Sequence, residues 1–443
     1  MNKPILYIYV PEINSRVRYI FDLLIGELLG LMYKLTSSQE EYLSHRGPRF
    51  CYQSNAMQGE LTFGAAYLLF EKGIHEQNIK VDSYENVPVL FPLKKGLFAL
   101  PFDSFAASFY MISRYEEYLP YKKDDHGRFP AEESLAYRHN FLHRPVVNHY
   151  ALFLKKILKA AFPALSFDVK PFKYFPTYDV DSAYAYLSKG LIRNIGGYGK
   201  SLLEGDFKGI IERSKVLLKI IEDPFDNYDW LQQLHQQYSF NPIYFFLVGD
   251  YDEYDKNISI NINAYQTLIK SLSDKSKVGL HPSYASNQSP EKIDLEIKRL
   301  SSVLKREIKR SRQHFLKLNL PATYNRLIEH DIDKDYTMGF AAQPGFRAGI
   351  AASFYWYNLD EENKTGLRIY PFAIMDATYI YYKKDLPVNT MGAIKSIIDE
   401  VKEVNGLLIS LFHNNTLTTN ETGQHWRKIY TNLIAHAMSS YHD

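Results

Sequence analysis

Two acidic residues stand at the end of an apolar run in the segment Thr177–Asp181 (TYDVD). Asp179 and Asp181 are two positions apart, so both can face one pocket if a strand breaks there. One carboxylate can then bind a cation while the other acts as a base, because the cation keeps the second carboxylate ionised near neutral pH. The alternative is a turn or a helix cap, since Asp is common in both.

Two histidines follow similar apolar runs. His281 lies in Gly279–Ser283 (GLHPS), and His413 follows the run LLISLF. A ring nitrogen of His281 can bind a metal ion, and His413 is a candidate general acid. For either histidine taken alone, the alternative is a core or loop residue with its hydrogen bonds satisfied.

Two arginine segments add possible charge partners. Arg312 can hold a catalytic carboxylate through a bidentate bond, and the nearby His314 is a further possible metal ligand. The alternative for this pair is a helix end stabilised by cations. Arg347 lies between two glycines in Gly345–Gly349 (GFRAG), where it can bind a substrate oxygen or serve the fold.

The elements that must position these residues alternate between short strands and longer helices. Four apolar runs each end in an ionisable or polar residue, and they are Tyr174–Tyr178, Ile243–Val248, Lys277–Leu280 and Leu407–Phe412. Such alternation predicts a largely parallel sheet. Barrel enzymes place their sites at the carboxyl ends of their strands. About 275 residues from this part fit one α/β barrel.

The first part of the chain has its own alternation of strands and helices. Ile5–Val10 and Val89–Phe91 are expected to be strands, whereas Val17–Leu35, Phe105–Tyr118 and Tyr150–Ala161 are expected to be helices. Two prolines and a break in periodicity mark the boundary in Phe162–Pro171. We therefore expect a smaller α/β domain over residues 1–165 and a barrel domain over residues 166–443.

Composition narrows the possible classes of protein. The chain has 443 residues, 46% hydrophobic and 23% charged, with a net charge of +2. This balance gives no reason to expect a nucleic-acid partner. Cys51 is the single cysteine, so no intrachain disulfide can form. The most apolar stretch, Val17–Leu35, carries four charged residues and predicts a core helix rather than a membrane span. The protein is expected to be soluble and cytoplasmic.

Taken in order, these segments resemble the polysaccharide deacetylase family with its NodB-type homology domain. TYDVD resembles the family's opening Asp motif, and Pro242–Gly249 (PIYFFLVG) resembles the strand that follows it. GLHPS is similar to the His motif, Arg312 to the Arg motif, and Ser410–His413 (SLFH) to the last motif. The resemblance covers residues 172–417 and implies a distorted (β/α) barrel.

The resemblance also implies roles for the matching residues. Asp179 corresponds to the catalytic base, and Asp181 and His281 correspond to metal ligands. Arg312 corresponds to the arginine that orients the base, and His413 corresponds to the general acid.

One position departs from the family pattern. The second histidine expected four residues after His281 is Ala285. His314 is the nearest substitute, and with Asp181 and His281 it would rebuild an open site with two histidines and one carboxylate. The family's DxxDW motif is also missing, and Asp376 is a candidate for its supporting role in the pocket.

The leading hypothesis is therefore a metal-dependent hydrolase that removes N- or O-linked acetyl groups from a carbohydrate or polysaccharide. A divalent cation, with zinc as the first candidate, would be its cofactor. Arg347, Asp376 and an exposed Trp356 are the expected substrate-binding residues. The alternatives are a catalytically silent barrel that binds saccharide and a C–N hydrolase that acts on a small non-sugar amide. The sequence does not predict the oligomeric state.

Overall fold

The computed structural model describes residues 4–384 and 387–439. The first 165 residues, here called the N-terminal region, contain a four-stranded parallel sheet with the order β2-β1-β3-β4. Its strands are β1 (Leu6–Tyr9), β2 (Tyr33–Thr36), β3 (Arg49–Gln53) and β4 (Thr62–Gly64). β1 confirms the strand predicted over Ile5–Val10.

The helix predicted over Val17–Leu35 is too long. α1 (Ser15–Phe21) continues as a π-helix over Asp22–Leu28, and the chain then turns at Gly30 and enters β2. Gly30 has a φ of 64°, and an added Cβ would lie 2.6 Å from the backbone oxygen of Asp168. Only glycine suits this conformation and this contact. The apolar run continues across the turn, so its composition did not reveal where the helix ends.

The helix predicted over Phe105–Tyr118 is divided in two at Arg114, which has a left-handed φ of 55°.

The remaining elements of the N-terminal region surround its sheet. The elements are α2 (Gln39–Ser44), a 3-10 turn (Tyr67–Leu69), the hairpin β5 (Val81–Tyr84) and β6 (Val87–Leu90), α3 (Ser104–Ile112), 3-10 turns (Tyr115–Tyr118 and Ala131–Glu133), α4 (Leu135–Arg138) and α5 (Val146–Ala161).

The rest of the chain is a mixed α/β structure around a nine-stranded, mostly parallel sheet with the order β12-β13-β11-β10-β9-β8-β7-β15-β14. β12 is antiparallel to β13, and the other pairs are parallel. The strands are β7 (Lys173–Val180), β8 (Ile243–Phe246), β9 (Lys277–Leu280), β10 (Arg310–Ser311), β11 (Lys334–Asp335), β12 (Phe354–Asn358), β13 (Asn363–Ile369), β14 (Ile374–Met375) and β15 (Leu407–His413). The four strands expected to carry the site are all present.

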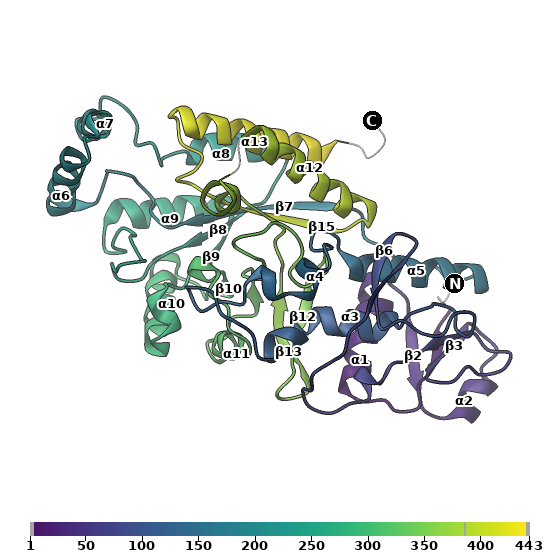
Figure 1. The fold of residues 1–443 in the computed structure, drawn as a ribbon. Helices are drawn as coiled ribbons and strands as arrows, with labels where there is room; N and C mark the ends of the chain where they lie inside the picture. The colour runs from purple at the N-terminus through teal and green to yellow at the C-terminus, as the bar shows by residue number, and fades with distance from the viewer. Residues whose placement is uncertain (1–3, 385–386, 440–443) are drawn as a thin grey trace.

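Helices connect these strands, as a parallel sheet requires. They are α6 (Gly190–Leu203), α7 (Phe207–Leu217), α8 (Tyr228–Gln237), α9 (Asn263–Lys275), α10 (Pro290–Leu304), α11 (Ala322–Glu329), α12 (Pro387–Glu403) and α13 (Glu421–Met438), with 3-10 turns at Ala285–Asn287 and His314–Leu316 and a π-helix at Thr378–Lys383. α12 and α13 pack together beside β15, whereas α6 and α7 stand at the far end of the molecule (Figure 1). Among the helices of the described residues, none is both long and apolar enough to cross a membrane.

One stretch of chain joins both ends of this sheet. β13 pairs with β11, and β14, four residues after β13, pairs with β15. Between them, Phe372 N donates to Met338 O (3.0 Å) and Ala373 N donates to Ile409 O (3.1 Å). Residues 368–375 therefore contact β11 at their start and β15 at their end.

The N-terminal region packs closely against the large sheet. Buried apolar residues from both parts form one continuous core. Arg16 forms an ion pair with Glu362, and Asn148 Oδ1 accepts a hydrogen bond from Ala351 N at 2.9 Å. These contacts join two helices of the N-terminal region to the loop between β12 and β13 and to the segment before β12.

Candidate active site

The carboxyl ends of β7, β9, β10 and β15 meet at one edge of the large sheet. They bring together Asp179, Asp181, His281 and His413, which line a pocket of about 250 Å³. Asp179 and Asp181 lie two positions apart, and alternation along the extended chain carries both side chains to the same side. Tyr178 and Val180, with the opposite orientation, are buried in the core.

The carboxylate of Asp179 is held on one side by Arg312. Arg312 Nη1 donates to Asp179 Oδ1 at 2.9 Å, and Nη2 donates to Thr177 Oγ1 at 2.7 Å. Nε of Arg312 donates to Tyr336 O at 2.9 Å, and the side chain is fully buried. These bonds leave Asp179 Oδ2 directed toward His281, whose Nε2 lies 3.7 Å away.

Asp181, His281 and His314 form a cluster whose ligand atoms all lie within 4.8 Å of one another. Nε2 of His281 is 3.2 Å from Asp181 Oδ1, and Nε2 of His314 is 3.8 Å from the same oxygen. The structure thus places His314 beside Asp181 and His281, as the sequence analysis proposed for a substitute of the missing histidine.

The outward nitrogens of both histidines are already engaged. His281 Nδ1 donates to Arg312 O at 2.6 Å, and His314 Nδ1 donates to Asp255 Oδ1 at 2.8 Å. In the neutral rings, each Nε2 therefore carries a lone pair directed toward Asp181. Metal-binding histidines are usually oriented by such partners. The sequence analysis missed Asp255, which lies in a loop with several other acidic residues and no pattern that distinguishes it.

These donors fit a divalent cation. Asp181 Oδ1 is buried and accepts no hydrogen bond from any described residue. Burial raises the pKa of Asp181, but the imidazoles of His314 and His281 outweigh this effect and hold the pKa well below its usual value. One carboxylate and two imidazoles with open coordination positions are a ligand set typical of zinc and iron sites.

His413 forms a second unit with Asp376. His413 Nδ1 lies 2.7 Å from Asp376 Oδ1, and His413 N donates to Asp376 Oδ2 at 2.8 Å. Burial lowers the pKa of His413, but Asp376 outweighs burial and raises it to about 10. Asp376 is fully buried and also accepts a hydrogen bond from Thr416 Oγ1. Asp376 was predicted to bind substrate, but it lies behind His413 and orients this side chain.

Two other residues that were predicted to bind substrate are buried. Trp356 is 1% exposed and packs edge-on against Tyr324, so it offers no stacking surface. The burial pattern of β12 explains this, because most of its aromatic side chains face the core. Arg347 is also buried, and its three nitrogens donate to Glu117 and to Gly339 O. Arg347 therefore joins the N-terminal region to the sheet.

The N-terminal region supplies one residue of the pocket that the sequence analysis missed. Arg128 lines the pocket, and its Nη1 donates to Phe315 O at 2.6 Å, directly beside His314. Nε of Arg128 donates to Asp124 Oδ2 at 2.7 Å. The ring of His126 packs on Phe315 with 4.9 Å between ring centroids. No local pattern could connect Arg128 to Phe315, since 187 positions separate them.

Two further pockets adjoin this pocket and share lining residues with it. One is lined by residues of the N-terminal region and shares Arg128, Leu316, Ala341 and Tyr382 with the site. The other contains Trp426 and shares Tyr381. Tyr381 and Tyr382 are 62% and 41% exposed. The site is therefore part of a wider depression with tyrosines at its rim.

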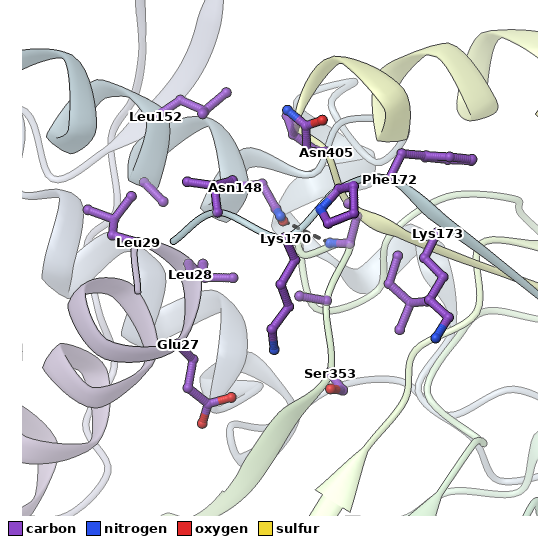
Figure 2. Close-up of a pocket in the computed structure, with 18 of the residues that line it drawn as sticks. Glu27, Leu28, Leu29, Asn148, Leu152, Lys170, Phe172, Lys173, Ser353 and Asn405 are labelled. Atoms are coloured by element: carbon purple, nitrogen blue, oxygen red, sulfur yellow. Dashed lines mark hydrogen bonds between the residues drawn. The ribbon is translucent and has the colours of Figure 1, made fainter. Parts of the chain in front are cut away.

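A larger pocket, about 470 Å³, lies beside the first residues of β7 and β15, at the end opposite the site. Figure 2 shows it between α5, the π-helix that contains Glu27, and the segment around Lys170 and Phe172. Glu27 forms an ion pair with Arg368 at 2.6 Å. Among the described residues, those that line this larger pocket include no histidine. It therefore does not compete with the candidate site for a metal ion.

Residues 6–163 match the model of a family of unknown function, DUF7033. No curated protein matches the chain. The matched family assigns no activity, so the function has to be argued from the side chains.

Solved structures similar to this chain include polysaccharide deacetylases. A polysaccharide deacetylase from Bacillus cereus is 11% identical, with a TM-score of 0.30 over 60% of this chain and 87% of that chain. Puue allantoinase is 9% identical, with a TM-score of 0.39 over 61% and 85%. A CE4 family pseudoenzyme from Bacillus anthracis is 8% identical, with a TM-score of 0.29 over 60% and 61%. Similarity at this level does not establish a family or an activity.

Proposed function

We propose that this protein is a metal-dependent hydrolase that removes acetyl groups from a carbohydrate. The observation that carries this proposal is the cluster of Asp181, His281 and His314, in which both imidazole Nε2 atoms face one buried carboxylate oxygen. A divalent cation held between these three atoms would bind the lone pairs of both Nε2 atoms and the charge of the carboxylate. Zinc is the first candidate among divalent cations.

The chain provides a base and an acid on two sides of this cluster. A divalent cation supplies Lewis-acid polarisation of a carbonyl group and lowers the pKa of water. Arg312 fixes Oδ1 of Asp179, which leaves Oδ2 to take a proton from the attacking water. His413, held by Asp376, donates a proton from Nε2 to the leaving nitrogen or oxygen.

The surroundings of the site favour a carbohydrate over a small non-sugar amide. A small amide would suit a closed pocket, whereas two further pockets adjoin this one and share Arg128 or Tyr381 with it. Tyr381 and Tyr382 at the rim offer exposed aromatic faces, which suit the apolar faces of sugar rings. These two tyrosines take the role that the sequence analysis gave to Trp356.

A silent saccharide-binding protein is the second candidate. The reason for considering it is Ala285, which cannot bind a metal ion and stands where the deacetylase pattern has a histidine. The orientation of His314 disfavours this candidate, because Asp255 fixes Nδ1 and leaves Nε2 directed toward the cluster.

The proposal includes a distorted (β/α) barrel of the NodB type over residues 166–443, preceded by an α/β domain over residues 1–165. The bonds of Phe372 and Ala373 support the barrel, because they join the two ends of the sheet through one stretch of chain. The cytoplasmic location expected from the sequence stays a prediction.

The test is elemental analysis of purified protein after incubation with zinc and removal of the excess. We compare the wild type with His281→Ala and His314→Ala, and we use His425→Ala as a matched control. His425 is an exposed histidine on α13. We expect about one zinc ion per chain in the wild type and the control, and a strong loss in the two site variants. Acetate release from acetylated oligosaccharides is then measured on the same samples.

Each result decides between the candidates. Zinc that is lost in both site variants, together with acetate release, supports the hydrolase. Zinc that is lost only with His281→Ala would refute His314 as the third ligand. A wild type that holds no zinc would refute the metal-dependent mechanism and leave the silent saccharide-binding protein as the better explanation.

A further inference from the structure

The helices α6 and α7 form a hairpin with an apolar surface that faces solvent. They pack against each other at one end of the molecule, away from both sheets (Figure 1). Ile192 and Leu203 of α6 are 86% and 91% exposed, and Leu218 at the end of α7 is 72% exposed. Further exposed large apolar residues of the hairpin and its exit are Leu191, Ile195, Leu202, Phe207, Ile211, Leu217, Ile220 and Ile221.

α6 exposes its apolar face and buries its polar face, whereas an ordinary surface helix does the opposite. Leu191, Ile195 and Leu202 lie at helical spacing on one stripe and are exposed, whereas Asn194 and Ser201 are buried. A helix that covers a core buries its apolar stripe. The exposed stripe on α6 is therefore available to an apolar partner, since large exposed apolar patches mark interaction sites.

Polar contacts hold the hairpin in this orientation. Asn194 Nδ2 donates to Gly190 O at 3.0 Å, and Arg213 Nη1 of α7 donates to Asn194 Oδ1 at 3.1 Å. Arg193 donates to the backbone oxygens of Lys256 and Asn257, which belong to the body of the protein. These bonds use the polar side of α6 for the fold and leave the apolar side outward.

The hairpin is also basic. Residues 189–221 contain seven basic and three acidic side chains, an excess of four positive charges, whereas the whole chain has an excess of only two. Lys200, Lys208, Lys215 and Lys219 are exposed among the apolar residues. A second copy of this surface would bring like charges together. An anionic lipid surface instead matches both the apolar residues and the lysines.

We propose that the α6–α7 hairpin docks this protein on an anionic membrane surface, with its exposed apolar residues, Ile192 and Leu203 among them, inserted between the lipids. The hairpin lies in the plane of the interface and does not span the bilayer. This inference does not depend on the proposed hydrolysis.

The test is flotation of the full-length protein with unilamellar vesicles. One set contains equal parts of phosphatidylcholine and phosphatidylglycerol, and the other contains phosphatidylcholine alone. We expect the wild type to float with the anionic set, and Ile192→Glu/Leu203→Glu to reduce the bound fraction at least tenfold. Leu295→Glu/Ile328→Glu is the matched control, because these residues are exposed on α10 and α11. The control should bind like the wild type.

Further measurements separate the possible occupants. Lys215→Glu/Lys219→Glu should weaken binding, and so should high salt, because screening weakens the attraction to anionic lipid. Thermal unfolding of each variant checks that it is folded. Three results would each overturn the proposal: no flotation of the wild type, equal flotation of the Ile192/Leu203 variant, or a stable dimer in sedimentation that this variant abolishes.

Discussion

Asp255 Oδ1 lies 2.8 Å from Nδ1 of His314, although 59 positions separate the two residues. Asp255 also accepts bonds from the backbone nitrogens of Tyr284 and Ala285, and it is fully buried. Burial raises the pKa of Asp255, but these bonds outweigh it and lower the pKa. Asp255 is therefore ionised, and its carboxylate orients the ring of His314.

The first prediction concerns this carboxylate. Asp255→Asn replaces the anion with a neutral amide. If its oxygen keeps the bonds from His314 and Tyr284, its NH₂ group faces the backbone donor of Ala285. Loss of such a partner typically weakens metal affinity by about 10- to 100-fold. Titration calorimetry with zinc measures the change. Asp250→Asn is the control, because Asp250 lies in the same loop, is exposed and pairs with Arg299. Equal affinities for both variants would contradict the role of Asp255.

The second prediction concerns Arg128, which holds the segment after His314. Phe315 and Leu316 both have left-handed φ values, 57° and 51°, which non-glycine residues adopt only when their surroundings impose them. Arg128→Met removes the bond to Phe315 O, so we expect about tenfold weaker zinc binding. Arg128→Lys should restore part of the affinity, because its ammonium can still donate.

A matched control separates this effect from general destabilisation. Arg16 is also buried and also joins the N-terminal region to the large sheet, through Glu362, but it lies away from the pocket. Arg16→Met and Arg128→Met should each lower stability by about 1–3 kcal/mol in thermal unfolding. Only Arg128→Met should change the affinity for zinc. If both variants bind zinc like the wild type, Arg128 serves the fold alone.

The sequence predicted the strands of the site well for a local reason. Asp179, His281 and His413 each follow an apolar run, and a parallel sheet collects the ends of such runs at one edge. Asp255 and Arg128 act from loops far along the chain, where no periodicity exists. The expectation that Trp356 is exposed was wrong because an aromatic-rich strand shows little contrast between its two faces. β12 buries most of its residues.

The third prediction concerns the pH dependence of the proposed acid. Burial lowers the pKa of His413, but Asp376, followed by Asp181 and Asp179, raises it to about 10, so His413 is protonated at neutral pH. In Asp376→Asn this pKa should fall toward about 6.5, the ordinary value for histidine. The protonated fraction would then be about 1% at pH 8.5, so activity should fall about 100-fold there and much less at pH 6.

The measurement is kcat/KM for acetate release between pH 5.5 and 9. Asp399→Asn is the matched control, since Asp399 forms a similar pair with His436 at 2.7 Å on an exposed surface away from the site. A uniform loss of activity at every pH in Asp376→Asn would mean that Asp376 positions His413 without setting its charge.

The fourth prediction concerns a buried histidine outside the site. His235 Nε2 lies 2.6 Å from Tyr178 Oη, and the His235 side chain is 5% exposed. Burial lowers the pKa of His235 to about 4. In the neutral ring Nε2 accepts from Tyr178, whose oxygen can in turn accept from Tyr430. A protonated Nε2 would have to donate, which would disturb this chain of bonds.

The sign of the effect follows from proton linkage. The unfolded chain binds a proton at His235 below about pH 6.5, whereas the folded protein binds it only near pH 4. The contribution of His235 to the free energy of unfolding is therefore fully present above pH 6.5. It is lost as the pH falls toward 4, by about 3 kcal/mol at most. Urea unfolding at several pH values measures this slope. His235→Gln should flatten it, because the amide oxygen still accepts from Tyr178 and does not titrate. His425→Gln, at an exposed position on α13, should keep the slope of the wild type. Parallel curves for all three proteins would show that His235 does not control the acid stability.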